Sequence, residues 1–431
     1  MKPTTSTRRP GPADATLSAS IEENVLHTVL RPATDWELAR YVRDAIEQQK
    51  PVEIVGSGSK RSIGRPTHAA TVVSPCIMRS VKLYEPSELV MAAEAGVLVS
   101  DIEAELENNG QMLAFEPVDL GPVLDKPAGR GTVGGMFAVD ISGSRRIAAG
   151  AGRDHLLGVR AVSGIGQIFK SGGRVLKDVT GIGLTRAVAG SWGTLGVITE
   201  ATFKVLPRPE MTATLVIIGL SNEIAVEAMC AALATPFEVT GAVHLELPLV
   251  ERLNSDAFRS AANSITALRL ENFSKFLPRR MERLQEALKT YGEVHVVGNE
   301  DSLYFWNELR QLSPMIGRTE QLWRISTLPN KGALLVSDIQ RYREAEAFFD
   351  WSGGLIWLSI PQAADAGASD IRRALAAYGG HATLIRADEE VRSNVEIFQP
   401  LDHGTERMTR NIKQAFDPAG ILNKGRMYAN I

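Results

Sequence analysis

The sequence predicts an α+β protein of more than one domain, and three observations point to this class. Its 431 residues correspond to two or three domains of about 150 residues each. Segments with helical and strand patterns alternate along most of the chain. Eighteen of the 38 glycines lie between residues 121 and 196, where even spacing would place about seven. Such density indicates turns with positive φ or backbone held against a ligand, although short strands joined by tight turns would also collect glycine.

The opening half of the chain is predicted to contain α/β units. A capping box at Thr34–Glu37 predicts a helix of about 14 residues that ends near Gln48. The β-branched run Val52–Val55 predicts a buried strand, which leads directly into a glycine loop. A strand at Leu89–Glu94 and a second capping box, Ser100–Glu103, predict a further strand and helix.

After Leu206–Pro209 the glycine density falls, which marks a domain boundary. Strand and helix patterns then alternate through Met211–Leu220, Glu223–Leu233, Val239–Leu247, Arg279–Lys289, Val294–Val297, Tyr304–Leu312, Leu322–Leu328, Ile339–Phe348, Leu355–Ile360, Ile371–Tyr378 and Ala382–Ile385. This order predicts an α+β domain on a mixed or antiparallel sheet. A last helix, Thr405–Phe416, should end before Asp417–Pro418.

Composition excludes several classes of protein. The 47 Lys and Arg nearly balance the 50 Asp and Glu, so neither nucleic acid nor an anionic membrane is an expected partner. Residues Met1–Ser18 lack the apolar stretch of a signal peptide and are expected to form a mobile tail. No apolar run approaches the ~20 residues that span a bilayer. We therefore expect a cytoplasmic protein, with at most peripheral contact to the inner membrane through partners.

Metal chemistry is not expected from this chain. Cys76 and Cys230 are its only cysteines, too few for an iron–sulfur cluster. The seven histidines form no HExxH motif and no group at metal-ligand spacing. We predict no metal site, so any cluster would belong to a partner.

Three loops of glycine and hydroxyl residues are the candidate binding elements. The first, Gly56–Ser57–Gly58–Ser59–Lys60, follows a strand but lacks the third glycine of a Rossmann fingerprint, and no Walker A loop occurs. Its amides, hydroxyls and lysine would suit a pyrophosphate. The second is Gly131–Met136 and the third Gly190–Glu200. Together they could wrap an extended dinucleotide.

These loops resemble the FAD-binding domain of the vanillyl-alcohol oxidase superfamily, whose members carry T-[IV]-G-G and G-T-L-G-[VI]-[IV]-T-E motifs. Tyr84–Val90, Gly150–Gly158 and Phe416–Asn423 are similar to further family blocks in the same order. Within it, Gly110–Pro117 and Gly172–Val179 resemble hallmarks of the FAD-binding E subunits of bacterial glycolate oxidases. The chain departs from that pattern at Thr180–Leu184, which lacks the usual tyrosine and aspartate.

The resemblance implies the domain plan and a set of cofactor residues. It implies a PCMH-type FAD-binding domain of two α/β subdomains over residues 19–209, a smaller α+β cap over 210–397, and a segment, 398–431, that returns to the FAD domain. It implies non-covalent FAD. The expected FAD residues are Gly56, Ser57, Gly58, Ser59, Lys60, Glu116, Pro117, Thr132, Val133, Gly134, Gly135, Gly193, Thr194, Gly196, Val197 and Ile198.

The resemblance further implies one subunit of a hetero-oligomeric oxidoreductase. A related catalytic flavoprotein subunit would oxidise glycolate to glyoxylate, and an iron–sulfur subunit would accept the electrons. The sequence supplies no compelling base: Asp402–Glu406 only partly matches the E-H-G-I-G of complete enzymes, and His403 is expected to be exposed or locally bonded.

Two alternatives remain open. The chain could be a self-sufficient FAD-dependent 2-hydroxy-acid dehydrogenase of the D-lactate type, with Arg324 or Arg386 of the cap holding the carboxylate. By default such arginines are exposed or paired surface charges. Otherwise the chain could be an assembly scaffold that has lost FAD, a reading that the departures at Ile182 and Gly183 favour.

Overall fold

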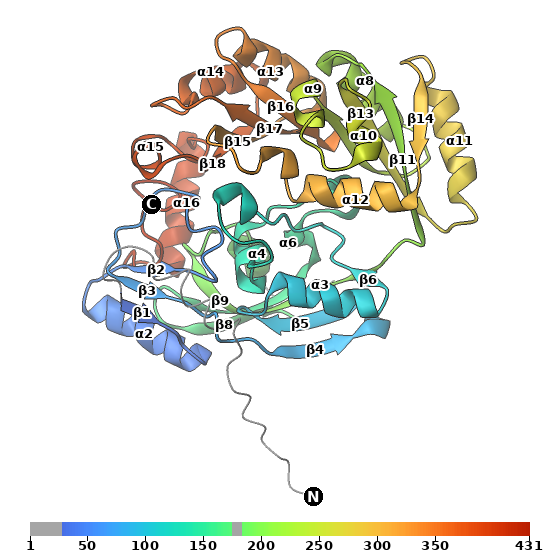
Figure 1. The fold of residues 1–431 in the computed structure, drawn as a ribbon. Coiled ribbons are helices and arrows are strands. Elements are labelled where there is room, and N and C mark those ends of the chain that lie inside the picture. Colours follow the sequence, from blue (N-terminus) through green and yellow to red (C-terminus); the bar gives the residue numbers. More distant parts are fainter. Residues whose placement is uncertain (1–27, 175–182) are drawn as a thin grey trace, which may run out of the picture.

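The computed structural model describes residues 28–174 and 183–431. Within these ranges the fold is α+β, as predicted. Figure 1 shows residues 28–209, here called the N-terminal part, below a large sheet formed by residues 210–397, here called the cap. The expected tail Met1–Ser18 and most of the motif segment Gly172–Leu184 lie outside the described residues.

The N-terminal part contains two main sheets. The first is parallel, with order β1-β3-β2, and its strands are β1 (Thr28–Leu30), β2 (Val52–Ile54) and β3 (Thr71–Val73). The second is antiparallel, with order β4-β5-β9-β7-β8, and its strands are β4 (Val81–Glu85), β5 (Val90–Glu94), β7 (Leu156–Ser163), β8 (Ile168–Gly172) and β9 (Gly196–Lys204). A short pair joins β6 (Gln111–Met112) to β10 (Leu206–Pro207). The helices here are α2 (Asp35–Glu47), α3 (Val99–Asn108), α4 (Val133–Val139), α5 (Arg146–Ala149), α6 (Gly152–His155) and α7 (Leu184–Val188).

Only the N-cap bond of the first predicted capping box forms, because the Glu37 carboxylate accepts from the amide before Thr34 and not from that of Thr34, and the second box is absent. Thr34 Oγ1 accepts a hydrogen bond from the Glu37 amide at 3.2 Å, and the Glu37 carboxylate accepts from the Ala33 amide at 2.7 Å. Helix α3 instead begins at Val99 without a side-chain cap. The Ser100 hydroxyl donates to the Gly129 carbonyl at 3.2 Å, so it ties this helix to a loop and does not cap it.

The cap is built on an eight-stranded antiparallel sheet with order β14-β11-β13-β12-β16-β17-β15-β18. Its strands are β11 (Met211–Ile218), β12 (Val239–Leu245), β13 (Ile265–Asn272), β14 (Val294–Val297), β15 (Gln321–Ser326), β16 (Glu346–Asp350), β17 (Leu355–Ile360) and β18 (His381–Arg386). Its longer helices are α8 (Asn222–Leu233), α11 (Leu277–Leu288), α12 (Asn299–Arg310), α13 (Gly332–Gln340) and α14 (Ala368–Tyr378). Each half follows a βαββαβ pattern with the same internal strand order, so the cap is a structural duplication joined at β12 and β16.

Two strands of this sheet were missed in the sequence. Strand β13 is buried over most of its length, and β16 follows helix α13 after a five-residue connection, 341–345. The expected segment Ile339–Phe348 was therefore wrong as one element, because the helix ends at Gln340 and the chain extends again from Glu346.

The C-terminal segment returns to the N-terminal part, as Figure 1 shows for α16 (His403–Phe416). Leu422 forms a parallel bridge with Val52, which extends the edge of the three-stranded sheet. Lys413 is a buried residue of α16, and its ammonium donates to Asp417 at 2.7 Å and to the Thr194 carbonyl at 2.8 Å. This segment thus braces a glycine loop distant in the sequence.

Candidate cofactor site

The three glycine loops meet at one pocket in the N-terminal part. Its empty space is about 720 Å³, mouth included, which is within the usual range for ligand pockets. Twelve of the expected residues line it: Gly56, Ser57, Gly58, Ser59, Lys60, Thr132, Gly134, Gly135, Gly193, Gly196, Val197 and Ile198.

The first loop presents unused amides to the pocket. Gly58 has φ 87°, a conformation that favours glycine. Within the described residues, the backbone N–H groups of Gly58, Ser59 and Lys60 donate to no protein acceptor. The loop is held from behind, because the Ser74 hydroxyl donates to the Gly56 carbonyl at 2.9 Å and the Ser57 hydroxyl donates to the Arg130 carbonyl. Successive free amides of this kind form an anion-binding concavity.

The second loop packs tightly against the first. Thr132 caps α4, and its hydroxyl accepts from the Gly135 amide at 3.3 Å. A Cβ placed on Gly56 would lie 2.6 Å from that hydroxyl oxygen, and one on Gly134 would lie 2.8 Å from the Ala95 Cβ. Side chains at these positions would therefore force the loops apart.

A residue of the C-terminal segment fastens the third loop. Asn423 accepts from the Ile54 amide at 2.7 Å and donates to the Trp192 carbonyl at 2.7 Å. It thereby joins the strand before the first loop to the start of the third. Gly193 has φ 73°, and a Cβ there would lie 2.8 Å from Asn423 Nδ2.

Lys60 is the free cation of the pocket. Its ammonium has no hydrogen-bond or ion-pair partner among the described residues. Burial lowers its pKa, and the negative charge of Asp119 opposes that effect. Arg61 and Arg426, which also line the pocket, are both engaged by Glu53, at 2.6 and 3.7 Å.

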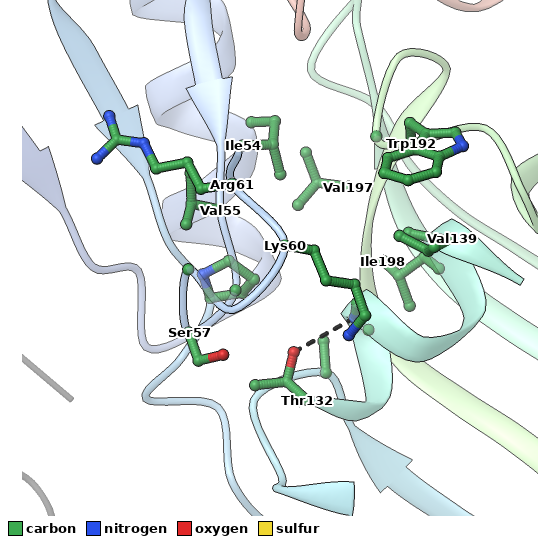
Figure 2. A pocket seen from close by; sticks show the side chains of 18 of the residues that line it. Ile54, Val55, Ser57, Lys60, Arg61, Thr132, Val139, Trp192, Val197 and Ile198 are labelled. Carbon is green, nitrogen blue, oxygen red and sulfur yellow. Dashed lines mark hydrogen bonds between the residues drawn. The ribbon is translucent and has the colours of Figure 1, made fainter. Parts of the chain in front are cut away.

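Figure 2 shows how charge and apolar surface are divided. Lys60 extends toward Thr132, while Val139, Trp192 and Ile198 lie together on one side of the pocket. The polar end suits a diphosphate and the apolar wall suits a ring system, so the lining fits an FAD-like dinucleotide. Further lining residues were not predicted from the sequence, namely Ile54, Val55, Arg61, Pro75, Ala95, Ala138, Val139, Trp192 and Arg426. Trp192 lies within the third predicted loop, Gly190–Glu200, so the loop itself was a signal that could have identified this lining residue.

Four expected residues do not line this pocket. Val133 is fully buried in the core, and the Thr194 hydroxyl donates to the Ser191 carbonyl at 2.7 Å. Pro117 lines an adjoining cavity of about 490 Å³ that shares Lys60 and Val139 with the pocket.

Glu116 instead joins the N-terminal part to the cap. Its carboxylate pairs with Arg145 at 2.9 Å and with Arg269 of β13 at 2.8 Å, and Arg145 also pairs with Glu271 at 2.6 Å. Burial alone would raise the pKa of Glu116, but the two guanidinium groups lower it below its usual range. The structure therefore places Glu116 in an ion-pair network between the N-terminal part and the cap, and among the described residues its carboxylate forms no hydrogen bond with the three glycine loops.

The cap arginines differ from the expectation of exposed or paired surface charges. Arg386 is 9% exposed and donates to the carbonyls of Val123, Met315 and Glu320. Arg324 is half-buried and, within the described residues, pairs with no carboxylate. His403, by contrast, is exposed as the first residue of α16.

The described ranges, 28–174 and 183–431, hold neither a cluster of metal ligands nor a helix that could span a membrane. They contain no group of three or more His, Cys, Asp and Glu side chains placed to hold a metal ion. No helix in the same ranges has the length and apolar character needed to cross a bilayer.

Comparison with known proteins agrees with the dinucleotide pocket. Residues 27–172 match the FAD binding domain family. The chain is 33% identical over 399 residues to glycolate oxidase subunit GlcE of Escherichia coli K12, covering 91% of this chain and 97% of that protein. It is 24% identical to glycolate oxidase subunit GlcD of Bacillus subtilis, covering 93% and 88%. A solved structure, 4-ethylphenol oxidase from Gulosibacter chungangensis, has the same fold, with a TM-score of 0.69, 14% identity and coverage of 97% and 93%.

Proposed function

The chain belongs to the family of FAD-binding proteins that includes glycolate oxidase subunit GlcE, and on that premise we propose that it is the FAD-binding subunit of a complex that oxidises glycolate to glyoxylate. The observation that carries the proposal is the convergence of three separate glycine loops on one pocket. FAD, when bound, supplies the acceptor for a hydride.

The residues of the pocket have distinct roles in holding FAD. The free amides of Gly58 and Ser59 and the ammonium of Lys60 would hold the diphosphate. The apolar wall of Val139, Trp192 and Ile198 would exclude water from a ring. In this arrangement loop amides and a lysine would hold the diphosphate, and not the N-terminus of a Rossmann-type helix.

The proposal assigns the remaining chemistry to partner subunits. Among the residues that the structure describes, the pocket lining includes Lys60, Arg61 and Arg426 but no Asp, Glu or His that could accept a proton. The two cysteines of the chain, Cys76 and Cys230, cannot bind an iron–sulfur cluster, which needs four ligands. We therefore infer a related flavoprotein subunit as the site of glycolate oxidation and an iron–sulfur subunit as the electron acceptor.

The visible absorption spectrum of the purified chain tests the proposal. A bound flavin should be present or should be taken up from added FAD, whereas a colourless chain that takes up none would indicate a scaffold. Glycolate or D-lactate with a dye acceptor should not bleach the flavin of the isolated chain. Rapid bleaching would identify a self-sufficient dehydrogenase instead. In the reconstituted complex, His403→Ala should retain turnover, because His403 is exposed and does not line the pocket.

A further inference from the structure

Residues far from the first glycine loop in the sequence hold the end of that loop. After Lys60 the chain turns through residues 61–65 before it reaches β3. Two buried arginines bind carbonyl groups of Lys60 and of this turn: Arg426 comes from the C-terminal segment and Arg392 from the cap. Both lie outside residues 27–172, the part that matches the FAD binding domain family. The loop is therefore supported by parts of the chain outside that domain.

Arg426 binds the backbone directly after the free amides of the loop. Its Nη2 donates to the Lys60 carbonyl at 3.1 Å and to the Arg61 carbonyl at 3.4 Å. Its own carbonyl accepts from the Arg65 amide at 2.9 Å. Its Nη1 lies 3.7 Å from the carboxylate of Glu53, which also pairs with Arg61 at 2.6 Å. These contacts hold Arg426, which is only 6% exposed, in one place.

Two successive peptide planes carry the position of Arg426 to an amide of the pocket. Arg426 binds the Lys60 carbonyl, whose peptide also contains the Arg61 N–H. That N–H donates to the Gly58 carbonyl at 3.0 Å, and the peptide of this carbonyl contains the Ser59 N–H, one of the free amides. Because a trans peptide is planar and its C=O and N–H point in opposite directions, each bond fixes the direction of the next group. Arg426 thereby helps to aim the Ser59 amide.

The cap holds the same turn through a reciprocal pair of arginines. Arg392 of α15 (Glu389–Asn394) donates from Nη1 to the Gly64 carbonyl at 3.0 Å. In the other direction, Arg65 donates to the Ser393 carbonyl at 2.9 Å. A Cβ on Gly64, which has φ 85°, would lie 3.0 Å from a backbone oxygen of the C-terminal segment, so the turn packs closely against that segment. The cap and the C-terminal segment therefore fix the end of the loop together.

Positive charges lie close to one another around Arg426. Burial lowers the pKa of Arg426 to about 10, the carboxylate of Glu53 opposes that effect, and the charges of Arg392 and Arg61 add to it. The guanidinium group of Arg426 still carries its charge at neutral pH. A diphosphate in the pocket would bring negative charge to these cations and reduce their mutual repulsion.

We propose that Arg426 and Arg392 are positioning residues for FAD, which hold the carbonyl groups at the end of the first loop so that its free amides face the diphosphate. Amides that are already aimed at a ligand need no reordering when it binds, which favours affinity. The proposal rests on the proposed function, because its ligand is FAD. It makes FAD binding depend on the C-terminal segment and on the cap as well as on the glycine loops themselves.

Titration of the FAD-free full chain with FAD, followed by quenching of flavin fluorescence, tests the proposal. Arg426→Gln should weaken FAD binding about tenfold or more, because the charge-assisted bonds that hold the loop are lost. Arg392→Gln removes one bond at the end of the turn and should weaken binding about threefold or more. Arg410→Gln is the matched control: this exposed arginine of the C-terminal segment also binds a carbonyl, that of Asn430, and a carboxylate, that of Glu406. It should leave the affinity unchanged.

A double variant separates positioning of the loop from a general structural role. If Arg426 acts through the loop, its effect should overlap with that of Lys60, which the same loop carries. Arg426→Gln combined with Lys60→Met should then bind FAD at most about threefold more weakly than the more impaired single variant. If Arg426 only stabilises the fold, the two losses of affinity should multiply.

The fold of each FAD-free variant is checked by urea unfolding, which should remain a single cooperative transition. If Arg426→Gln does not fold, Arg392→Gln, alone and combined with Lys60→Met, decides the question in the same way. The proposal is overturned if the folded variants bind FAD as the wild type does, if Arg410→Gln weakens binding equally, or if the losses multiply. A wild-type chain that binds no FAD would contradict the proposed function as well, whereas normal FAD binding by the variants would contradict the positioning role alone.

Discussion

Replacing Lys60 by Met is the sharpest test of the pocket, because it should weaken FAD binding without destabilising the FAD-free protein. The side chain keeps its length, while the only unpaired cation among the described lining residues is lost. A hydrogen bond to a charged group contributes about 1.5–3 kcal/mol, which corresponds to a roughly 10- to 150-fold weaker affinity for FAD. The FAD-free protein should not be destabilised. Burial lowers the pKa of Lys60, so the folded state disfavours the ammonium at neutral pH, and its removal should leave the free energy of unfolding unchanged or higher.

Two measurements on the same preparations check this prediction. Quenching of flavin fluorescence during titration of the FAD-free chain gives the Kd, and urea unfolding of the FAD-free chain gives its stability. Lys170→Met is the control, since Lys170 is an exposed lysine on β8 of the same part of the molecule. An unchanged Kd for Lys60→Met would refute the assignment of Lys60 to the diphosphate. A loss of stability without FAD would show that the lysine serves the fold instead.

Three further changes test other parts of the structure. Gly58→Val should reduce the amount of FAD retained on purification, because a branched residue cannot adopt φ 87° without strain. Gly173→Val is the control, because Gly173 has an ordinary φ and open space around it, and this variant should retain FAD. An equal loss of FAD from both variants would argue against a role of the first loop in FAD binding. Glu116→Gln should lower the free energy of unfolding in urea by about 3–5 kcal/mol, because it breaks a buried ion pair. Glu107→Gln, which breaks an exposed pair, should lower it by at most about 1 kcal/mol. Equally small losses of stability in the two variants would contradict a buried network at Glu116. Burial raises the pKa of Asp350 to about 7. The wild-type protein should therefore lose up to about 4 kcal/mol of stability as the pH rises from about 4 to above 7, because only the unfolded state ionises this group in that range. If Asp350→Asn shows the same pH profile of stability, Asp350 is not the cause.

Local sequence patterns predicted much of the secondary structure of the N-terminal part. The helix start capped by Thr34 and the strand before Gly56 depend on residues within a few positions of one another, and both are present in the structure. The convergence of the three glycine loops was inferred only from the number and type of their residues. Family resemblance added the order of the blocks, including the block Phe416–Asn423 of the returning C-terminal segment.

Long-range packing decided what the local patterns could not. Strand β13 is buried along most of its length, so it lacks the alternation that would separate it from a helix, and the duplication of the cap emerges only from strand pairing. Glu116 stands in a motif beside Pro117, yet its partner Arg269 lies 153 positions away, on β13 of the cap.

The neighbouring residues Arg145 and Arg146 illustrate the same division most clearly. Nothing in their sequence neighbourhoods distinguishes Arg145 from Arg146, because charge pairing depends on which carboxylates the fold brings near. The fold brings Glu116 and Glu271 to Arg145, and it leaves Arg146 over the ring of Trp351. Residue order therefore sets turns, caps and strand starts through neighbours a few bonds apart, whereas the charge balance of each buried site is set by groups that meet only when distant segments pack.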